Sequence, residues 1–273
     1  MRARHVLVAA AIAAVVAWRH HDTPAPLRFA TFNIEDFPKS AQQIEAAFDE
    51  IERLDAGFVA LQEIHDARAV VIAARRRLGP SWRFVDAEPG VPYDLGVLFD
   101  SERFALVSTT VHDGTRLGRN KPTFEVRLAP RDGGDVLRVL VVHLRCCNEG
   151  RDTRAEQHLA LLGIVRAARR SGERVVVLGD FNATTADDRR DLATLARASG
   201  MAWATESLAC TAFWRRDDGC PRSRLDHVLT WAVPDTVVAA GACATEGCEA
   251  QDRCPLYAEQ VSDHCPVVVT IAH

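Results

Sequence analysis

The sequence predicts an α/β domain over residues 27–273, and three observations lead to this fold class. Short apolar runs recur along the chain, amphipathic segments with helical spacing separate several of them, and no repeat or linker interrupts residues 27–273. Apolar residues make up 48% of the 273 residues, which is enough for a sizeable core. This composition argues against an intrinsically disordered chain.

The first predicted helix begins at Ser40, a favourable N-cap, with Gln43 placed to close a capping box. Apolar residues then recur at helical spacing from Ile44 to Leu54, and Gly57 is predicted to end the segment. The second helix carries three arginines at its C-terminal end, where cations complement the helix dipole. The further predicted helices are residues 66–78, 153–170 and 187–199.

Apolar or alternating runs between Gly, Pro and Asp residues are predicted to be strands. The Val-Val-Val-Leu run at 175–178 is typical of a strand that is buried on both faces. In chain order, the predicted strands are residues 27–32, 58–61, 95–99, 104–111, 123–128, 136–144, 175–178, 225–231, a segment near Val237, and 265–271.

Residues 1–17 have the features of an export signal. Arg2 and Arg4 give a charged start, and the apolar run 6–17 is too short to span a bilayer comfortably. Small residues at Val15 and Ala17 predict cleavage after Ala17, followed by a short polar lead over 18–26. We therefore expect a periplasmic or secreted protein, a monomer with no stable membrane anchor.

The formal net charge of −4 argues against a strong non-specific nucleic-acid binder, whose footprint is a basic face. It leaves open a nuclease that has only a local positive groove.

Eight cysteines suit an oxidising compartment and favour disulfides. Cys210 and Cys220 flank a short loop and are predicted to pair, whereas residues 243–254 offer several further pairings. Zinc is the rival interpretation, but the intervals between these cysteines lack the paired CxxC spacing of zinc sites.

Polar residues with catalytic potential lie within or at the ends of several predicted strands. Each one alone is explained more simply as a turn former or, for His143, as a core histidine. Together they are harder to explain by packing, because ligands of α/β folds collect at such sheet edges. They combine hard oxygen ligands for Mg²⁺ or Mn²⁺ with amides and imidazoles. The set is Asn33, Glu63, His143, Asp180, Asn182, Asp226, Asp263 and His264.

Short motifs around these residues resemble, in their order, those of the endonuclease/exonuclease/phosphatase superfamily, which includes deoxyribonuclease I. The blocks are Thr31-Phe32-Asn33, Leu61-Gln62-Glu63, His143-Leu144, Gly179-Asp180-Phe181-Asn182, Leu225-Asp226-His227 and Ser262-Asp263-His264-Cys265-Pro266. The resemblance covers residues 27–271. It implies a four-layered α/β sandwich of two packed mixed β-sheets flanked by helices.

The resemblance also implies the roles of the residues. Glu63 would be the principal ligand of Mg²⁺ or Mn²⁺, with Asn33 close by, Glu35 where repair enzymes of the family carry an acid, and Asp263 as a further metal ligand.

The remaining motif residues would carry out the in-line attack of water on phosphorus. Asp180 would orient or deprotonate the water and Asn182 would hold the water or a phosphoryl oxygen. His264, oriented by Asp226, would contact the phosphate, and His143 would protonate the leaving oxygen or bind the phosphate.

The expected enzyme is a metal-dependent phosphodiesterase with a phosphodiester substrate, a nucleic acid being the first candidate. Deoxyribonuclease I carries arginines where this chain has Glu35 and His65, which weakens an assignment to duplex DNA. A sphingomyelinase-like lipid enzyme or a small-molecule phosphoesterase is the alternative. A non-catalytic binding module is the third possibility. The presence of a suitable residue at every principal catalytic position argues against it.

Some residues outside the motifs are also candidates for contact with substrate. Tyr93 and Arg119 are expected near the substrate, and a cationic lip around the proposed Cys210–Cys220 loop would receive a polyanion. Arg154 and Gln157 are expected to be exposed on a helix surface. The residues of the lip are Arg215, Arg216, Arg222 and Arg224.

Overall fold

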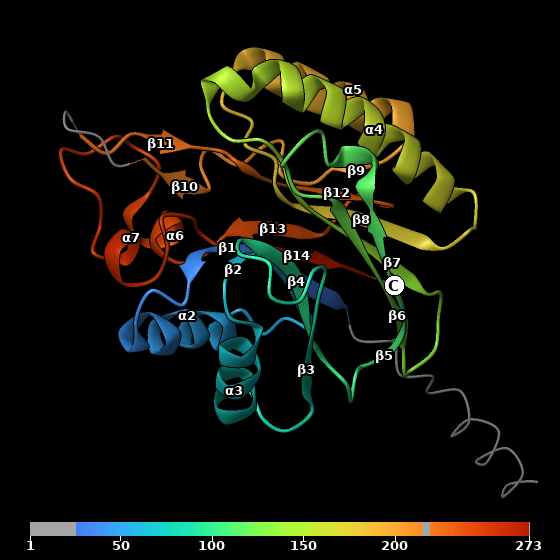
Figure 1. Ribbon diagram of the computed structural model, residues 1–273, viewed down its shortest axis with the longest axis horizontal. Coiled ribbons are helices and arrows are strands. Elements are labelled where there is room, and N and C mark those ends of the chain that lie inside the picture. The colour runs from blue at the N-terminus through green and yellow to red at the C-terminus, as the bar shows by residue number, and fades with distance from the viewer. Residues whose placement is uncertain (1–25, 215–218, 273) are drawn as a thin grey trace, which may run out of the picture.

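Two six-stranded β-sheets pack face to face in the computed structural model, which describes residues 26–214 and 219–272 (Figure 1). The first sheet contains both parallel and antiparallel pairs, because β1 runs parallel to β2 but antiparallel to β14. Its strands, in order across the sheet, are β13 (Thr236–Ala239), β14 (Val267–Ile271), β1 (Leu27–Phe37), β2 (Phe58–Ile64), β4 (Asp94–Asp100) and β3 (Trp82–Asp86).

The second sheet is also mixed, with β7 and β8 as its parallel pair. A separate two-stranded ribbon is formed by β10 (Ala212–Phe213) and β11 (Arg222–Ser223). The strands of the second sheet, in order, are β5 (Phe104–His112), β6 (Thr123–Pro130), β7 (Leu137–His143), β8 (Arg174–Asp180), β12 (Asp226–Thr230) and β9 (Ala202–Trp203).

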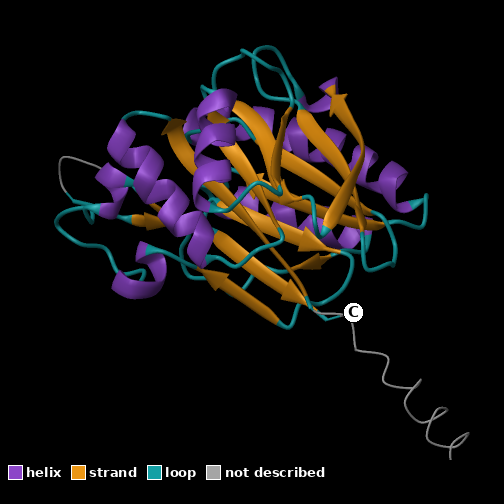
Figure 2. Cartoon of the chain, turned by 90° about the horizontal axis from the view of Figure 1, so that it is seen from below, coloured by secondary structure: helices purple, strands orange, loops and turns teal. Residues whose placement is uncertain are grey.

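Helices cover the outer faces of both sheets (Figures 1 and 2). α2 (Ala41–Arg53) and α3 (Ala67–Arg77) pack on the first sheet, and α4 (Arg151–Arg169) and α5 (Ala186–Ser199) pack on the second. The four-layered sandwich is confirmed. The short helical segments are η1 (Asp113–Thr115), η2 (Asn148–Gly150), α6 (Ala242–Glu246) and α7 (Tyr257–Gln260).

The largest apolar cluster fills the space between the two sheets. Phe29 and Phe58 stack there with ring centroids 5.0 Å apart, and Phe104 meets Phe58 edge-on at 5.8 Å. Aromatic pairs of this kind add to the burial of apolar area, so this layer anchors the two sheets to each other.

The parallel pairs place several strand ends at one edge of the sandwich. β1 and β2 end together in the first sheet, as β7 and β8 do in the second, and these strands contact one another across the interface between the sheets. Residues at the carboxyl ends of these four strands therefore meet at one edge, which is where the predicted site residues lie.

The secondary structure differs from the sequence prediction in a few places. β3 was not predicted, and α2 ends at Arg53 rather than at Gly57. Ser40 is the N-cap, as predicted, and accepts a bond from the Gln43 amide. Gln43 does not close a capping box: its side chain is buried and bonds the carbonyls of Ile34, Glu35 and Val261 and the amide of Lys39.

The predicted Cys210–Cys220 disulfide is wrong. The structure pairs Cys210 with Cys248, Cys220 with Cys254 and Cys243 with Cys265. In the β10–β11 ribbon, Ala212 pairs with Ser223, so continuing the register would place Cys210 opposite Leu225 rather than opposite Cys220. Cys210 and Cys220 are therefore not opposite each other in the ribbon. Each instead forms a disulfide with a cysteine of the segment that precedes β14.

The expected exposure of Arg154 and Gln157 on α4 is also wrong, because both side chains are fully buried. Arg154 forms a two-pronged ion pair with Asp188, with Nε–Oδ1 2.9 Å and Nη2–Oδ2 2.8 Å, and donates to the carbonyls of Arg145 and Cys147. The Gln157 side chain bonds the backbone of Arg145 and Thr115. Both residues fix the loop that follows β7.

The predicted signal peptide and its cleavage point lie outside the described residues. Within residues 26–214 and 219–272, no helix is both long enough and apolar enough to span a bilayer.

Candidate active site

Asp180, the last residue of β8, lies at the centre of the predicted site. Its side chain is 2% exposed, and its backbone is paired with His143 of β7 on one side and Asp226 of β12 on the other. The preceding Gly179 has φ +138°, and a Cβ there would lie 2.0 Å from the Val142 carbonyl oxygen. Only glycine fits this close approach, which sets the position of Asp180.

One buried amide links the two sheets at this edge. Asn33 Nδ2 donates to Glu63 Oε1 at 3.0 Å and to Asp180 Oδ2 at 3.3 Å. Its carbonyl oxygen accepts from the Glu35 amide at 3.1 Å. Because the amide is fully buried, its orientation is fixed, and the carboxylates of Glu63 and Asp180 are held on the same side of Asn33.

Both histidines of the motifs approach Asp180. His143 Nε2 lies 3.5 Å from Asp180 Oδ2 and 3.8 Å from Glu63 Oε1, and His264 Nε2 lies 3.9 Å from Asp180 Oδ2. The His143 side chain is 14% exposed, and its Nδ1 is buried without a partner among the described residues. The two imidazoles therefore flank one carboxylate oxygen.

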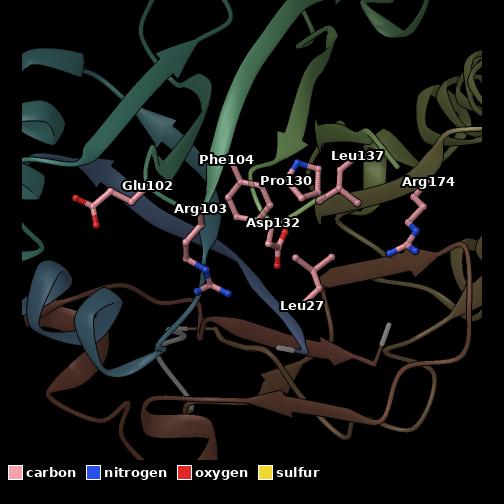
Figure 3. Close-up of a pocket in the computed structure, with 8 residues that line it drawn as sticks. All are labelled: Leu27, Glu102, Arg103, Phe104, Pro130, Asp132, Leu137 and Arg174. Carbon is pink, nitrogen blue, oxygen red and sulfur yellow. The ribbon is translucent and has the colours of Figure 1, made fainter. Parts of the chain in front are cut away.

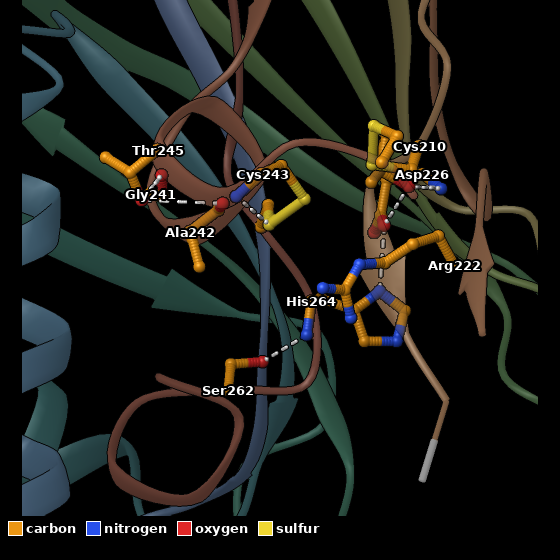
Figure 4. Close-up of a disulfide and its surroundings, with 12 residues drawn as sticks. Cys210, Arg222, Asp226, Gly241, Ala242, Cys243, Thr245, Ser262 and His264 are labelled. Atoms are coloured by element: carbon orange, nitrogen blue, oxygen red, sulfur yellow. Dashed lines mark hydrogen bonds and ion pairs between the residues drawn. A yellow bond between two sulfur atoms is a disulfide. The ribbon is translucent and has the colours of Figure 1, made fainter. Parts of the chain in front are cut away.

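His264 is oriented by a chain of buried bonds (Figure 4). Its Nδ1 lies 2.8 Å from Asp226 Oδ2, which also accepts from Thr211 Oγ1 at 2.8 Å. The backbone amide of His264 donates to Ser262 Oγ at 3.0 Å, and Ser262 Oγ donates to the backbone carbonyl of Asn33 at 2.7 Å. The imidazole is thus tied to both sheets.

Asn182 follows β8 and folds back onto it. Its amide donates to Asp180 Oδ1 at 2.8 Å, and its side-chain Nδ2 lies 3.1 Å from both Asp180 Oδ2 and the Leu144 carbonyl. Asp180 accordingly receives bonds from two asparagine side chains and one backbone amide.

Non-glycine residues with positive φ gather at this edge of the sandwich. Such backbone conformations are costly and cluster at functional sites. The residues are Glu35 (φ 45°), Asp36 (51°), Glu63 (64°), Tyr93 (58°) and Asn182 (49°).

The electrostatics of the site favour a charged His264. Burial alone would lower its pKa, but Asp226, then Asp263 and Asp180, hold the pKa of His264 well above its usual value. Burial raises the pKa of Asp180 although both imidazoles act against it. Burial would raise the pKa of Glu63 too, but His143 and Asn33 outweigh it and the pKa of Glu63 is lowered.

Glu35 and Asp263 lie at the border of this network. Glu35 Oε2 accepts from the Asp263 amide at 2.9 Å and pairs with Lys39 Nζ at 2.8 Å. The Asp263 carboxylate is 42% exposed and lies 3.8 Å from His264 Nε2. Partial burial, opposed by His264 and reinforced by Glu35 and Glu63, raises the pKa of Asp263.

The donor set suits a largely hydrated hard cation. Across residues 26–214 and 219–272, no three or more His, Cys, Asp or Glu side chains converge as a metal cluster. Asn33 Nδ2 does orient the carboxylate of Glu63, whose side chain is 18% exposed. Mg²⁺ is typically bound through one or two carboxylates and keeps several of its waters, so Glu63 fits such an ion.

Tyr93 and Arg119 line a pocket of about 330 Å³ together with Glu63 and His143. Tyr93 is 44% exposed and lies edge-on to His65, with ring centroids 4.3 Å apart. Lys121 also lines the pocket, a cation that the sequence analysis did not single out. The structure thus brings both predicted substrate contacts to one side of the network.

A second hollow, of about 170 Å³, lies at the other end of the sandwich (Figure 3). Its lining includes Leu27, Phe104, Leu137 and Arg174, which begin β1, β5, β7 and β8. The candidate site is at the far ends of β1, β7 and β8, so this hollow is separate from it.

The proposed cationic lip is only partly described, because Arg215 and Arg216 lie outside the described residues. Arg224 is held by the carbonyls of Thr205 and Leu208 and does not form a free lip. Arg222 lies over the Phe213 ring, with its guanidinium carbon 4.1 Å from the ring centroid.

Two residues of the network were missed as contributors. Ser262 begins the motif Ser262-Asp263-His264, so its position beside His264 was a usable signal. Thr211 holds Asp226 and also accepts from the amides of Leu225 and Asp226 at 3.0 Å. No local pattern marks Thr211, since its role depends on the pairing of β10 with β11.

A family model described as the Endonuclease/Exonuclease/phosphatase family matches residues 30–264. The chain belongs to this family. The match contains every residue of the network described above, from Asn33 to His264. The prediction that the protein is a hydrolase of phosphate esters is confirmed, as is the family resemblance. No curated protein sequence matches the chain.

Solved structures of low sequence identity share the fold. Zebrafish (D. rerio) TDP2, complexed with a single-strand DNA product, is 16% identical with a TM-score of 0.72, over 90% of this chain and 98% of that one. The human nocturnin catalytic domain with a bound sulfate anion is 18% identical, with a TM-score of 0.67 over 90% and 93%. A mannosyl-6-phosphatase of Bacteroides thetaiotaomicron is 14% identical, with a TM-score of 0.62 over 90% and 99%.

Proposed function

We propose that this chain is an exported, metal-dependent phosphodiesterase of the nuclease type. One observation carries the proposal: Asp180 Oδ2 lies 3.5 Å from His143 Nε2 and 3.9 Å from His264 Nε2, at a buried edge shared by both sheets. A carboxylate between two imidazoles provides a base, an acid and a cation for one phosphate. Each such positioned group typically contributes about 10²–10⁴-fold to a rate.

Asp180 acts as the base in this proposal. Its raised pKa makes it a better proton acceptor than an exposed aspartate, while bonds from Asn33 and Asn182 keep the carboxylate oriented. Asn182 holds the attacking water or a phosphoryl oxygen.

His264 and His143 act on the phosphate. Asp226 keeps His264 charged and directs its Nε2 toward the site, where it binds a phosphoryl oxygen and stabilises the charge that develops there. His143 donates a proton to the leaving oxygen or a hydrogen bond to the phosphate.

Mg²⁺ or Mn²⁺ would be held by Glu63, with Asn33 alongside it and Glu35 and Asp263 at the border of the site. When bound, such an ion neutralises negative charge on the phosphate. The lowered pKa of Glu63 keeps this carboxylate ionised and ready to bind a cation at neutral pH.

A nucleic acid is the substrate that we favour. The shared fold of a TDP2 complexed with a single-strand DNA product supports this choice. Tyr93, Arg119 and Lys121 would contact the substrate beside Glu63. A lipid or small-molecule phosphoester and a non-catalytic binding role are the other outcomes of the test.

The test is hydrolysis of bis(4-nitrophenyl) phosphate in Mg²⁺, Mn²⁺ and EDTA, followed by plasmid DNA, RNA and sphingomyelin. We expect hydrolysis that EDTA abolishes, with nucleic acid preferred over sphingomyelin. Asp180→Asn and His264→Ala should lose nearly all turnover while remaining folded by circular dichroism. Full activity in either purified variant would contradict the assigned roles, and no hydrolysis of any substrate would favour the binding module.

Export is supported by the three disulfides, which persist in oxidising compartments. The mature protein isolated from its source should begin at Trp18, as N-terminal sequencing or intact mass would determine. Retention of residues 1–17 in that protein would contradict cleavage after Ala17.

A further inference from the structure

A groove lies along the β10–β11 ribbon, beside the loop that follows Asn182. It consists of two hollows, of about 370 Å³ and 330 Å³, that have three lining residues in common. The shared residues are Thr184, Arg222 and Ser223. They come from the loop after β8 and from β11, so the groove lies between the two segments that carry Asn182 and Asp226.

Arg222 is an incompletely paired cation in this groove. Its guanidinium stacks on Phe213, and Nη1 lies 3.5 Å from the Cys220 carbonyl oxygen. Its Nε and Nη2 are buried and have no partner among the described residues. Unpaired N–H groups of a charged side chain are costly in a buried position, so an acceptor that entered beside Arg222 would satisfy both donors. Two neighbouring guanidinium donors match an oxyanion such as phosphate.

The register of the ribbon places Arg222 close to the catalytic residues. Ala212 pairs with Ser223 on one side and with His264 on the other, and the Phe213 amide donates to the Asp263 carbonyl at 2.7 Å. Two strand spacings, on the order of 10 Å, therefore separate the backbones of β11 and His264. This separation suits a phosphate beside the scissile one rather than the scissile phosphate itself.

The rest of the groove adds positive charge and polar donors. Arg189, exposed on α5, lines the second hollow together with Arg224 and Arg222. The hydroxyl groups of Thr184 and Ser223 offer neutral donors. Glu149 lines the first hollow only, so the two hollows together carry more cationic than anionic side chains.

We propose that Arg222, Thr184 and Ser223, with Arg189 beside them, form a subsite for a phosphate group adjacent to the scissile phosphodiester of a nucleic-acid strand. This inference rests on the proposed phosphodiesterase function and narrows its substrate to a strand with neighbouring phosphates. A phosphocholine headgroup is disfavoured, because it would bring a cation rather than an anion toward the active site.

The experiment compares dinucleotides that share one scissile diester: TpT, pTpT and TpTp. The readout is the ratio of kcat/KM for each phosphorylated form to kcat/KM for TpT. In the wild-type protein, we expect one phosphorylated form to be preferred by tenfold or more, as a charged hydrogen bond allows. Arg222→Met keeps much of the stacking stem but removes the charge, and it should bring this ratio to about 1.

Arg190→Met is the matched control, since Arg190 is exposed on the same helix as Arg189 but does not line the groove. It should keep the wild-type ratio. A ratio near 1 in the wild type, or an equal ratio in wild type and Arg222→Met, would overturn the subsite. If Arg222→Met does not fold, Arg222→Lys replaces it. Lysine keeps the charge without the paired donors, and we expect an intermediate ratio.

Calorimetric binding of thymidine 3′,5′-bisphosphate separates this proposal from the catalytic one, because it needs no turnover. Affinity that is at least tenfold weaker in the Arg222 variant than in the wild type, and unchanged in Arg190→Met, supports the subsite even if no substrate is hydrolysed. Hydrolysis of bis(4-nitrophenyl) phosphate by the wild type, together with equal affinity in wild type and variant, supports the catalytic proposal and rejects the subsite.

Discussion

His264 Nδ1 lies 2.8 Å from Asp226 Oδ2, and both side chains are almost completely buried. The pair joins a residue at the start of β12 to a residue just before β14, and thereby connects the two sheets. Asp226 has a second partner in Thr211 Oγ1, also at 2.8 Å. Asp226 thus both favours the charged form of the His264 imidazole and fixes the orientation of the ring.

We predict that Asp226→Asn lowers kcat by about 10²-fold or more, because it removes the charge that favours the His264 imidazolium. KM for a small diester should change much less than kcat, and the melting temperature should fall, because the ion pair that raises the pKa of His264 also stabilises the folded protein at neutral pH. Steady-state kinetics and thermal melts measure both quantities.

Thr211→Val is the matched control for the Asp226 prediction. It removes the hydroxyl bonds to Asp226 but keeps the carboxylate charge beside His264. We expect a smaller loss of kcat together with a measurable loss of stability, about 1 kcal/mol or more. If Thr211→Val reduced kcat as much as Asp226→Asn, geometry rather than charge would explain the effect.

The core of the site could be predicted because its residues sit in short motifs at strand ends. Asn33, Glu63 and Asp180 each follow an apolar run, and parallel pairing of such runs brings their ends to one edge. The close approach of Gly179 to Val142 explains why one of these motifs begins with glycine. Local sequence therefore carries most of the information about this edge.

Other features depend on contacts between distant segments and could not be predicted. The disulfide partners are set by the register of the β10–β11 ribbon and by the bridge between Cys220 and Gln251. Arg154 is typical of an exposed helix residue by composition, yet α5 presents Asp188 to it and makes its burial possible. No local pattern at Arg154 indicates this partner.

The Cys243–Cys265 disulfide anchors the residue next to His264, so we predict that its loss affects both stability and catalysis. Closing a loop with a sequence separation of 22 contributes about 3 kcal/mol in the chain-entropy description. The Cys243→Ala/Cys265→Ala double variant should therefore unfold at lower denaturant concentration and show a reduced kcat.

The double variant Cys220→Ala/Cys254→Ala is the comparison for this prediction. It removes a disulfide that closes a loop of sequence separation 34 and that does not adjoin His264. We expect a similar loss of stability with a smaller effect on kcat. Equal effects of the two double variants on kcat would argue against a specific role of Cys265 in holding His264.

Cys146 and Cys147 are the cysteines without a disulfide in the structure. The adjacent Cys146 thiol and burial raise the pKa of the Cys147 thiol from 9.0 to about 11. A thiol with this pKa is almost entirely protonated at pH 8, and the thiolate is the reactive form. We predict that iodoacetamide modifies Cys147 slowly at pH 8.

Cys146→Ala tests the cause of this slow reaction, because it removes the neighbouring thiol that contributes most to the raised pKa of Cys147. Alkylation of Cys147 at pH 8, followed by peptide mass spectrometry, should become several-fold faster in the variant. An unchanged rate would attribute the protection to burial. Absence of any alkylation at either cysteine in the unfolded, non-reduced wild type would instead show that the two sulfurs are bonded to each other.

His158 of α4 is buried, and neither of its ring nitrogens has a partner among the described residues. Burial lowers the pKa of His158 from 6.5 to about 4. Asp191 and Asp188 act to raise this pKa, but burial together with Arg151 and Arg154 outweighs them. Between these values the unfolded chain binds a proton that the folded chain does not, so stability is lost as the pH falls from 6.5 toward 4. From pH 7.5 to pH 5 this loss amounts to about 2 kcal/mol.

We predict that His158→Leu reduces the acid sensitivity of the fold. The variant should be as stable as the wild type or more stable at pH 7.5, since leucine leaves no unpartnered polar atom, and its advantage should grow by about 2 kcal/mol at pH 5. Urea unfolding at the two pH values measures this difference. His227, whose pKa burial also lowers, stays in both proteins. A constant difference between variant and wild type at both pH values would mean that His158 does not titrate on unfolding as its burial requires.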